Sequence, residues 1–174
     1  MDVKNLSRDQ LEYMLTDFAK RWLAHDGLWF QKVEQSYGMD EAIRLDTAAW
    51  EQFTVIEAKR IMDFLSIEPG GGISALKKAL QYRLYSLINT QEMIEEDRKT
   101  LIFRMKECRV QSARKRKQLP EFPCRPVGMA EYAHFARTID PRIKTRCLYC
   151  PPDEYPQDSY CAWEFTLDSE KKDV

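Results

Sequence analysis

The chain has 174 residues, of which 44% are hydrophobic and 32% are charged, and its formal net charge is -1. These values exclude disordered and collagen-like proteins and the strongly basic proteins that bind nucleic acids. The length suits one globular domain with a buried core. We therefore expect a single domain over residues 1–174, with a helical half at about 7–89, a β-rich half at about 90–167 and a frayed tail at 168–174.

The N-terminal segment gives no sign of export. It has no apolar core followed by a small-residue cleavage site, and no run in the chain approaches the roughly 18 apolar residues of a membrane span. We expect a cytoplasmic protein that does not bind membranes. Persistent disulfides are rare in that reducing compartment, so five cysteines that include a CxxC pair indicate a metal site or a reactive thiol.

The first helix is predicted to begin near Ser7. Ser7 and Gln10 have the spacing of a capping box, and apolar residues at helical spacing follow them. The segment that follows His25 either kinks this helix at Gly27 or starts a second helix capped by Asp26. Gly38 is expected to end the helical segment.

Two more helices are predicted on either side of a glycine-rich break. A broad apolar face from Asp40 to Phe64 is typical of a helix buried between neighbours. The sequence PGGG at 69–72 interrupts it, because proline stops helices and glycine maximises backbone freedom. Leucines at helical spacing then predict a helix from Ile73 to about Asn89.

The pattern changes to that of strands after Thr90. Alternation over 101–106 predicts a half-buried strand, with 92–96 as its antiparallel partner. Cys108 would lie on the open face of this strand or behind a bulge. The basic run at 114–117 lacks interleaved aromatic residues, so we interpret it as a solvated loop and discount nucleic acid as a partner.

The chain closes with a short helix and two strands. The helix is expected from Gly128 to Thr138, and the strands from Ile143 to Leu148 and from Tyr160 to Leu167. The predicted fold class is therefore α+β, with N-terminal helices packed against a small antiparallel sheet.

Four cysteines of the C-terminal half predict a zinc site. Their pattern is C-x22-C-x2-C-x10-C, and the CxxC pair precedes two prolines that would turn the chain. Four thiolates around a tetrahedral zinc ion make a closed structural site, and an iron-sulfur cluster fits the spacing less well. The alternative is that the cysteines are small buried hydrophobic residues. The predicted metal ligands are Cys124, Cys147, Cys150 and Cys161.

Polar residues set among aromatic residues in the helical half form a second candidate site. Carboxylates on an apolar helix face are costly unless paired, and they become candidates for raised pKa values in a pocket. The alternative is that they are hydrogen-bonded interior groups or helix caps. The members are His25, Asp26, Trp29, Asp46, Trp50 and Glu57.

Cys108 and His134 are two further candidates for a reactive side chain. Cys108 would be a nucleophile if a neighbouring cation lowered its pKa, and Arg104, Lys106 and Arg109 are close in sequence. A spare thiol without a catalytic role is the simpler interpretation. His134 lies off the main apolar side of its predicted helix and is interpreted as a bystander.

A family resemblance extends over about residues 15–167. It is carried by two long segments, 25–61 and 108–153, and by the closing YCAWEF. The chain resembles an uncharacterised group of bacterial and archaeal cytosolic proteins that is grouped with L-2-amino-thiazoline-4-carboxylic acid hydrolase-like proteins. The order of elements also resembles the 4-vinyl reductase domain, found in tetrapyrrole enzymes and aromatic-sensing regulators. In such sensors zinc is held by a cysteine, an acidic residue and two more cysteines, and Cys147 would replace the acidic ligand here.

The resemblance implies a ligand cavity between the helices and the sheet, beside the zinc layer. The leading hypothesis is a zinc-stabilised protein, expected to be a homodimer, that binds a small organic molecule in a pocket lined by His25, Asp26, Trp29, Trp50 and Glu57. The alternative is a hydrolase of a small cyclic amidine or amide. In that enzyme Cys108, or a water activated by Glu57 with His25 as a further candidate, would attack the carbon.

Overall fold

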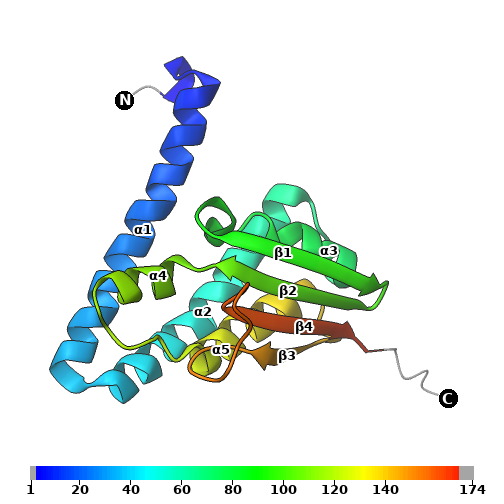
Figure 1. Ribbon diagram of the computed structural model, residues 1–174. Helices are drawn as coiled ribbons and strands as arrows, with labels where there is room; N and C mark the ends of the chain where they lie inside the picture. The colour runs from blue at the N-terminus through cyan, green and yellow to red at the C-terminus, as the bar shows by residue number, and fades with distance from the viewer. Residues whose placement is uncertain (1–2, 169–174) are drawn as a thin grey trace.

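A four-stranded antiparallel sheet with helices on one face forms the body of the protein, as the computed structural model shows for residues 3–168 (Figure 1). The strand order is β1-β2-β4-β3, and this confirms the predicted α+β class with a small antiparallel sheet. The elements are η1 (Val3–Asn5), α1 (Arg8–Tyr37), α2 (Met39–Leu65), α3 (Gly72–Leu80), η2 (Leu84–Leu87), β1 (Thr90–Asp97), β2 (Thr100–Glu107), α4 (Arg109–Arg116), α5 (Cys124–Ile139), β3 (Ile143–Tyr149) and β4 (Cys161–Leu167).

The two central strands present their apolar residues to the helices. In the register of β2 and β4, Leu101 lies opposite Phe165 and Phe103 lies opposite Trp163. These four side chains are at most 1% exposed. The alternation read from the sequence therefore places the correct faces inward, as expected for strands buried on one side.

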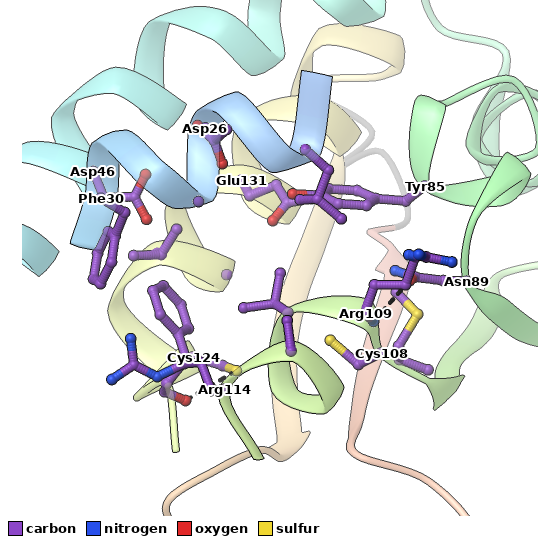
Figure 2. Close-up of a pocket in the computed structure, with 18 of the residues that line it drawn as sticks. Asp26, Phe30, Asp46, Tyr85, Asn89, Cys108, Arg109, Arg114, Cys124 and Glu131 are labelled. Carbon is purple, nitrogen blue, oxygen red and sulfur yellow. Dashed lines mark hydrogen bonds between the residues drawn. The ribbon is translucent and has the colours of Figure 1, made fainter. Parts of the chain in front are cut away.

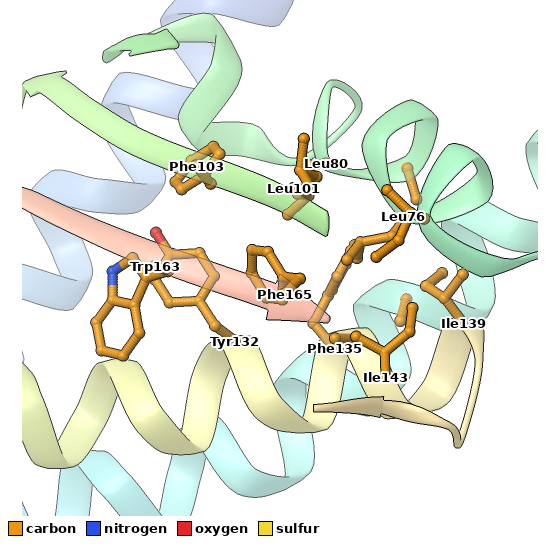
Figure 3. Packing of buried hydrophobic residues seen from close by; sticks show 14 of the residues in the cluster. Leu76, Leu80, Leu101, Phe103, Tyr132, Phe135, Ile139, Ile143, Trp163 and Phe165 are labelled. Atoms are coloured by element: carbon orange, nitrogen blue, oxygen red, sulfur yellow. The ribbon is translucent and has the colours of Figure 1, made fainter. Parts of the chain in front are cut away.

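The core lies between this face of the sheet and the helices α2, α3 and α5. Figure 3 shows Tyr132 and Phe135 extending from α5 toward β4, where the Tyr132 and Trp163 ring centroids lie 4.9 Å apart. The helix approaches the sheet closely at Gly128. A Cβ atom added there would lie 2.4 Å from Cζ2 of Trp163, so only glycine fits without rearrangement.

Helix α1 begins with the predicted capping box. The backbone amide of Gln10 donates to Ser7 Oγ, and the amide of Ser7 donates to Gln10 Oε1. The helix continues through Gly27 to Tyr37, so no second helix starts at Asp26. Its N-terminal half projects beyond the rest of the molecule in Figure 1.

Two predictions about element limits were wrong. The third helix ends at Leu80, where a continuous helix to about Asn89 was expected, and the chain turns so that Arg83 enters the core. The basic run expected in a solvated loop is part of α4. Its Arg114 is buried and forms two hydrogen bonds of 2.8 Å to Glu34 of α1, so the side chain is structural.

Candidate ligand cavity

A cavity of about 410 Å³ lies between α1, α4 and α5 at the end of the sheet where β2 stops and β4 begins (Figure 2). This volume is within the usual range of small-molecule sites. Most of the wall is apolar or aromatic. The apolar and aromatic lining residues include Leu23, Phe30, Trp50, Tyr85, Met105, Val110, Val127, Tyr132 and Trp163.

Three carboxyl groups from three helices gather on one side of this cavity. Asp26 comes from α1, Asp46 from α2 and Glu131 from α5, and Figure 2 shows them across the cavity from Cys108 and Cys124. We call Asp26, Asp46 and Glu131 the acidic side. Burial, together with the charges of Asp26 and Glu131, raises the pKa of Asp46 to about 7, against the effect of a hydrogen bond from Trp50.

The other two acids of this cluster are shifted in the same direction. Burial raises the pKa of Asp26, and His25 opposes that shift. Burial also raises the pKa of Glu131, although the neighbouring Arg83 guanidinium lowers it. Like charges and a low dielectric both disfavour ionisation, so the cluster holds protons more tightly than exposed carboxyls do.

A buried ion-pair network lies beneath the acidic side. Arg83 is 2% exposed, and its Nε donates to Glu57 Oε2 over 2.8 Å. Its Nη1 lies 2.6 Å from Glu131 Oε1. This ion pair occupies Glu131 Oε1, whereas Arg83 Nη2 is buried without a hydrogen-bond partner among residues 3–168. Trp163 Nε1 is a second atom of this kind, and its side chain lines the cavity.

The residues expected in the pocket separate into two groups. Asp26 and Trp50 line the cavity, whereas His25, Trp29 and Glu57 do not contribute to its wall. Trp29 is 70% exposed and lies outside the cavity wall. The Glu57 carboxylate is engaged by Arg83, which makes it a structural group in this arrangement.

The sequence patterns did not predict two charged residues of this region, Glu131 and Arg83. Glu131 interrupts the apolar run GMAEYAHFA, and Arg83 interrupts a run of leucines and tyrosines. A lone charge at a core position is itself a signal, because it must find a partner or a ligand. Their pairing could not be read from the pattern, since 48 positions of the chain separate Arg83 from Glu131.

The cysteines divide between the cavity and the neighbouring loop. Cys108, Cys124 and Cys161 line the cavity, and the thiols of Cys147 and Cys150 share a hydrogen bond. Within residues 3–168, no group of three or more His, Cys, Asp or Glu side chains is arranged to hold a metal ion. The thiols as placed therefore do not fit a four-thiolate site.

The candidate nucleophile lies at the cavity wall but in an unfavourable environment. Cys108 follows the end of β2 and is the N-cap residue of α4, so it belongs neither to the open face of the strand nor to a bulge. Burial raises the pKa of its thiol, which favours the unreactive protonated form. His134 Nδ1 lies 2.9 Å from the Ala130 carbonyl oxygen of its own helix.

The fold and the cavity define an α+β domain that encloses space for a small ligand. The chain belongs to a family of unknown function, DUF6125, whose model matches residues 4–167. Neither the curated proteins nor the solved structures gave a match. Among the described residues, no helix has the length and apolar character required to cross a bilayer.

Proposed function

We propose that this protein binds a small organic molecule in the cavity between α1, α4 and α5. The observation that carries the proposal is a cavity of about 410 Å³ whose mostly apolar wall includes polar groups, among them the Trp163 indole with an unsatisfied buried Nε1. Such a wall is typical of ligand sites, because apolar surface supplies affinity and a few polar groups fix the orientation. The ligand cavity implied by the 4-vinyl reductase resemblance supports the same function.

Native mass spectrometry of the purified protein tests this proposal. We expect a bound molecule in the wild type and its loss in Ala113→Trp, because Ala113 lines the cavity and an indole would fill it. Lys115→Trp is the control, since Lys115 is on the same helix but exposed and outside the wall. If a co-purified molecule persists in Ala113→Trp, it binds elsewhere and the proposal fails.

We also propose a structural zinc ion held by Cys124, Cys147, Cys150 and Cys161. Support comes from the cysteine spacing, the family resemblance, the paired thiols of the CxxC and the Cys124 amide, which donates to the Pro151 carbonyl oxygen over 3.0 Å. Because the thiols are not arranged as ligands, zinc uptake would require them to reorient. Metal analysis of the purified, reduced protein tests this proposal. One zinc ion per chain is the expected result, and protein that contains no zinc would rule the zinc site out.

The alternative function is hydrolysis of a small cyclic amidine or amide. One observation favours it, namely that Cys108 lies at the wall of the cavity. Two observations weaken it, since burial raises the pKa of this thiol and Glu57 is held by Arg83. Rapid labelling of Cys108 by a thiol reagent at neutral pH, blocked by an added ligand, is the result that would favour the hydrolase over the binding protein.

A homodimer is the proposed assembly. The projecting half of α1 carries three apolar side chains at residues 13–18 that are largely exposed in the described part of the chain. Tyr13 is 75%, Leu15 57% and Phe18 48% exposed. Exposed apolar surface of this kind marks interaction sites, and a second copy of the helix would cover it.

A further inference from the structure

The acidic side of the cavity lacks matching positive charge. Arg83 is the cation next to it, and Glu57 and Glu131 already share that guanidinium. Asp26 and Asp46 have only the adjacent His25 and a hydrogen bond from Trp50 to favour their ionised forms. The carboxyls thus outnumber the buried positive charge that faces them.

The cations elsewhere on the cavity wall do not make up this deficit. The exposed cations at the rim are Lys20, Arg109, Arg116 and Lys117. Arg114 is buried, but its guanidinium is engaged by Glu34 of α1 and by the Pro120 carbonyl oxygen. The excess of carboxyl groups is therefore a property of the interior.

A buried carboxyl of this cluster faces the cavity. Glu131 is 8% exposed, and its Oε1 lies 2.6 Å from Nη1 of Arg83, a guanidinium that it shares with Glu57. Figure 2 shows its carboxyl group directed into the cavity, between Asp26 and the Tyr85 ring. A carboxylate accepts several hydrogen bonds, so a ligand donor can still bind this group. The Trp163 side chain also lines the cavity, and its buried Nε1 has no hydrogen-bond partner within residues 3–168.

We propose that the ligand is a small organic cation, an ammonium or amidinium group on an apolar body, whose N–H groups bind Glu131, Asp26 and Asp46. This inference rests on the proposed function and specifies its ligand class. A cation supplies both the missing positive charge and N–H donors for the carboxyl oxygens. The aromatic rings of Trp50 and Tyr85 stack with centroids 6.0 Å apart beside the carboxyls, and aromatic faces also attract cations.

The other ligand classes fit less well. An anion would meet three carboxyl groups in a low dielectric, where like-charge repulsion is strong. A neutral molecule with one hydroxyl group could donate one hydrogen bond but would leave the charge uncompensated. The charge of the ligand is therefore the property that distinguishes the hypotheses.

Three probes of nearly equal size test the inference by calorimetry and tryptophan fluorescence at pH 7.5. They are 2-phenylethylamine, which is a cation, 2-phenylethanol, which is neutral, and 3-phenylpropanoate, which is an anion. We expect the amine to bind at least about tenfold more tightly than the alcohol, since charged hydrogen bonds are stronger than neutral ones, and the anion not to bind.

The acidic side is tested by Asp46→Asn, with Asp63→Asn as the control on the same helix. Asp63 is exposed and lies outside the cavity wall. We expect Asp46→Asn to abolish the preference for the amine while the alcohol still binds, and Asp63→Asn to leave the preference unchanged. The comparison of the three probes on the wild-type protein needs neither variant, so it tests the inference even if a variant folds poorly.

Each outcome has a definite meaning. If the alcohol binds as tightly as the amine, or Asp46→Asn keeps the preference, the ligand class is wrong but small-molecule binding survives. If the native protein binds none of the three probes and carries no co-purified molecule, the proposed function fails as well.

Discussion

Asp46 is the residue whose protonation most affects the cavity. Its carboxyl faces Asp26 of α1 and Glu131 of α5, with Trp50 of its own helix as hydrogen-bond donor, and burial raises its pKa to about 7. The unfolded value is 3.8, so between about pH 4 and pH 7 the folded protein binds the extra proton. Stability due to this group is therefore present below about pH 4 and is lost as pH rises through 7.

A pH series of denaturant unfolding measures this effect. Asp46→Asn cannot titrate, so its free energy of unfolding should fall less between pH 5 and pH 8 than that of the wild type, by at most about 3 kcal/mol. The difference between the two proteins isolates the carboxyl from other titrating groups. Parallel curves for wild type and variant would contradict the assignment.

Gly128 is a second residue with a testable role, because the absence of a Cβ atom there lets α5 pack closely against Trp163. Its missing Cβ leaves room for the Trp163 indole, so Gly128→Ala should lower the free energy of unfolding by about 1–3 kcal/mol through overpacking. Gly27→Ala is the matched control on α1. Its added Cβ would meet only Gln31 Nε2 at 3.9 Å, and the gain in helix propensity should make it neutral or stabilising.

At the scale of elements, Arg83 joins three segments of the chain. Its guanidinium contacts Glu57 of α2 and Glu131 of α5, and it lies 4.9 Å from the Phe135 ring centroid. Arg83→Met should lower the free energy of unfolding by about 3–5 kcal/mol, because it leaves two buried carboxyls without a cation. Chemical denaturation at pH 7 measures the loss.

The control for this prediction is an ion pair on the surface. Arg44→Met removes an exposed i,i+3 partner of Glu41 on α2, and it should leave the free energy of unfolding nearly unchanged, because solvent screens this pair. A similar loss in both variants would mean that the Arg83 network contributes no more than a surface pair.

The elements that the sequence predicted well are those governed by local rules. The capping box at Ser7, the stop at Gly38 and the alternation in β2 each depend on residues a few positions apart. The end of α3 and the helical state of α4 depend on distant partners instead. Arg83 and Arg114 are buried by acids on other helices, and no local pattern indicates such pairing.

The same distinction applies to the cavity. Asp26 and Trp50 could be proposed from polar residues on apolar helix faces, and the structure places both in the wall. Glu131 lies 85 positions after Asp46 in the chain, so only the tertiary fold brings the two carboxyl groups together. The wall is a product of packing, whereas its acidic character was visible in the sequence.

At the scale of the whole molecule, the projecting half of α1 determines the expected assembly. The double variant Leu15→Glu and Phe18→Glu should convert a dimer to a monomer, because charges replace the apolar surface that the second copy would cover. Light scattering after size exclusion gives the mass directly. Tyr37→Glu, at the other end of the same helix and 74% exposed, should leave the mass unchanged.

A wild-type mass of one chain at micromolar concentration would reject the homodimer without affecting the cavity proposals. Conversely, loss of the dimer together with loss of ligand binding in the double variant would show that assembly supports the cavity.

Helix α1 is both a wall of the cavity and the projecting surface, and no break separates the two parts. At about 1.5 Å of rise per residue, Arg8 lies about 27 Å along the helix axis from Asp26. A tilt of the helix by about 10° at Asp26 would therefore move its far end by about 5 Å. The helix has the geometry of a lever arm, in which a small tilt at the carboxyl cluster corresponds to a displacement of several ångströms at the opposite end.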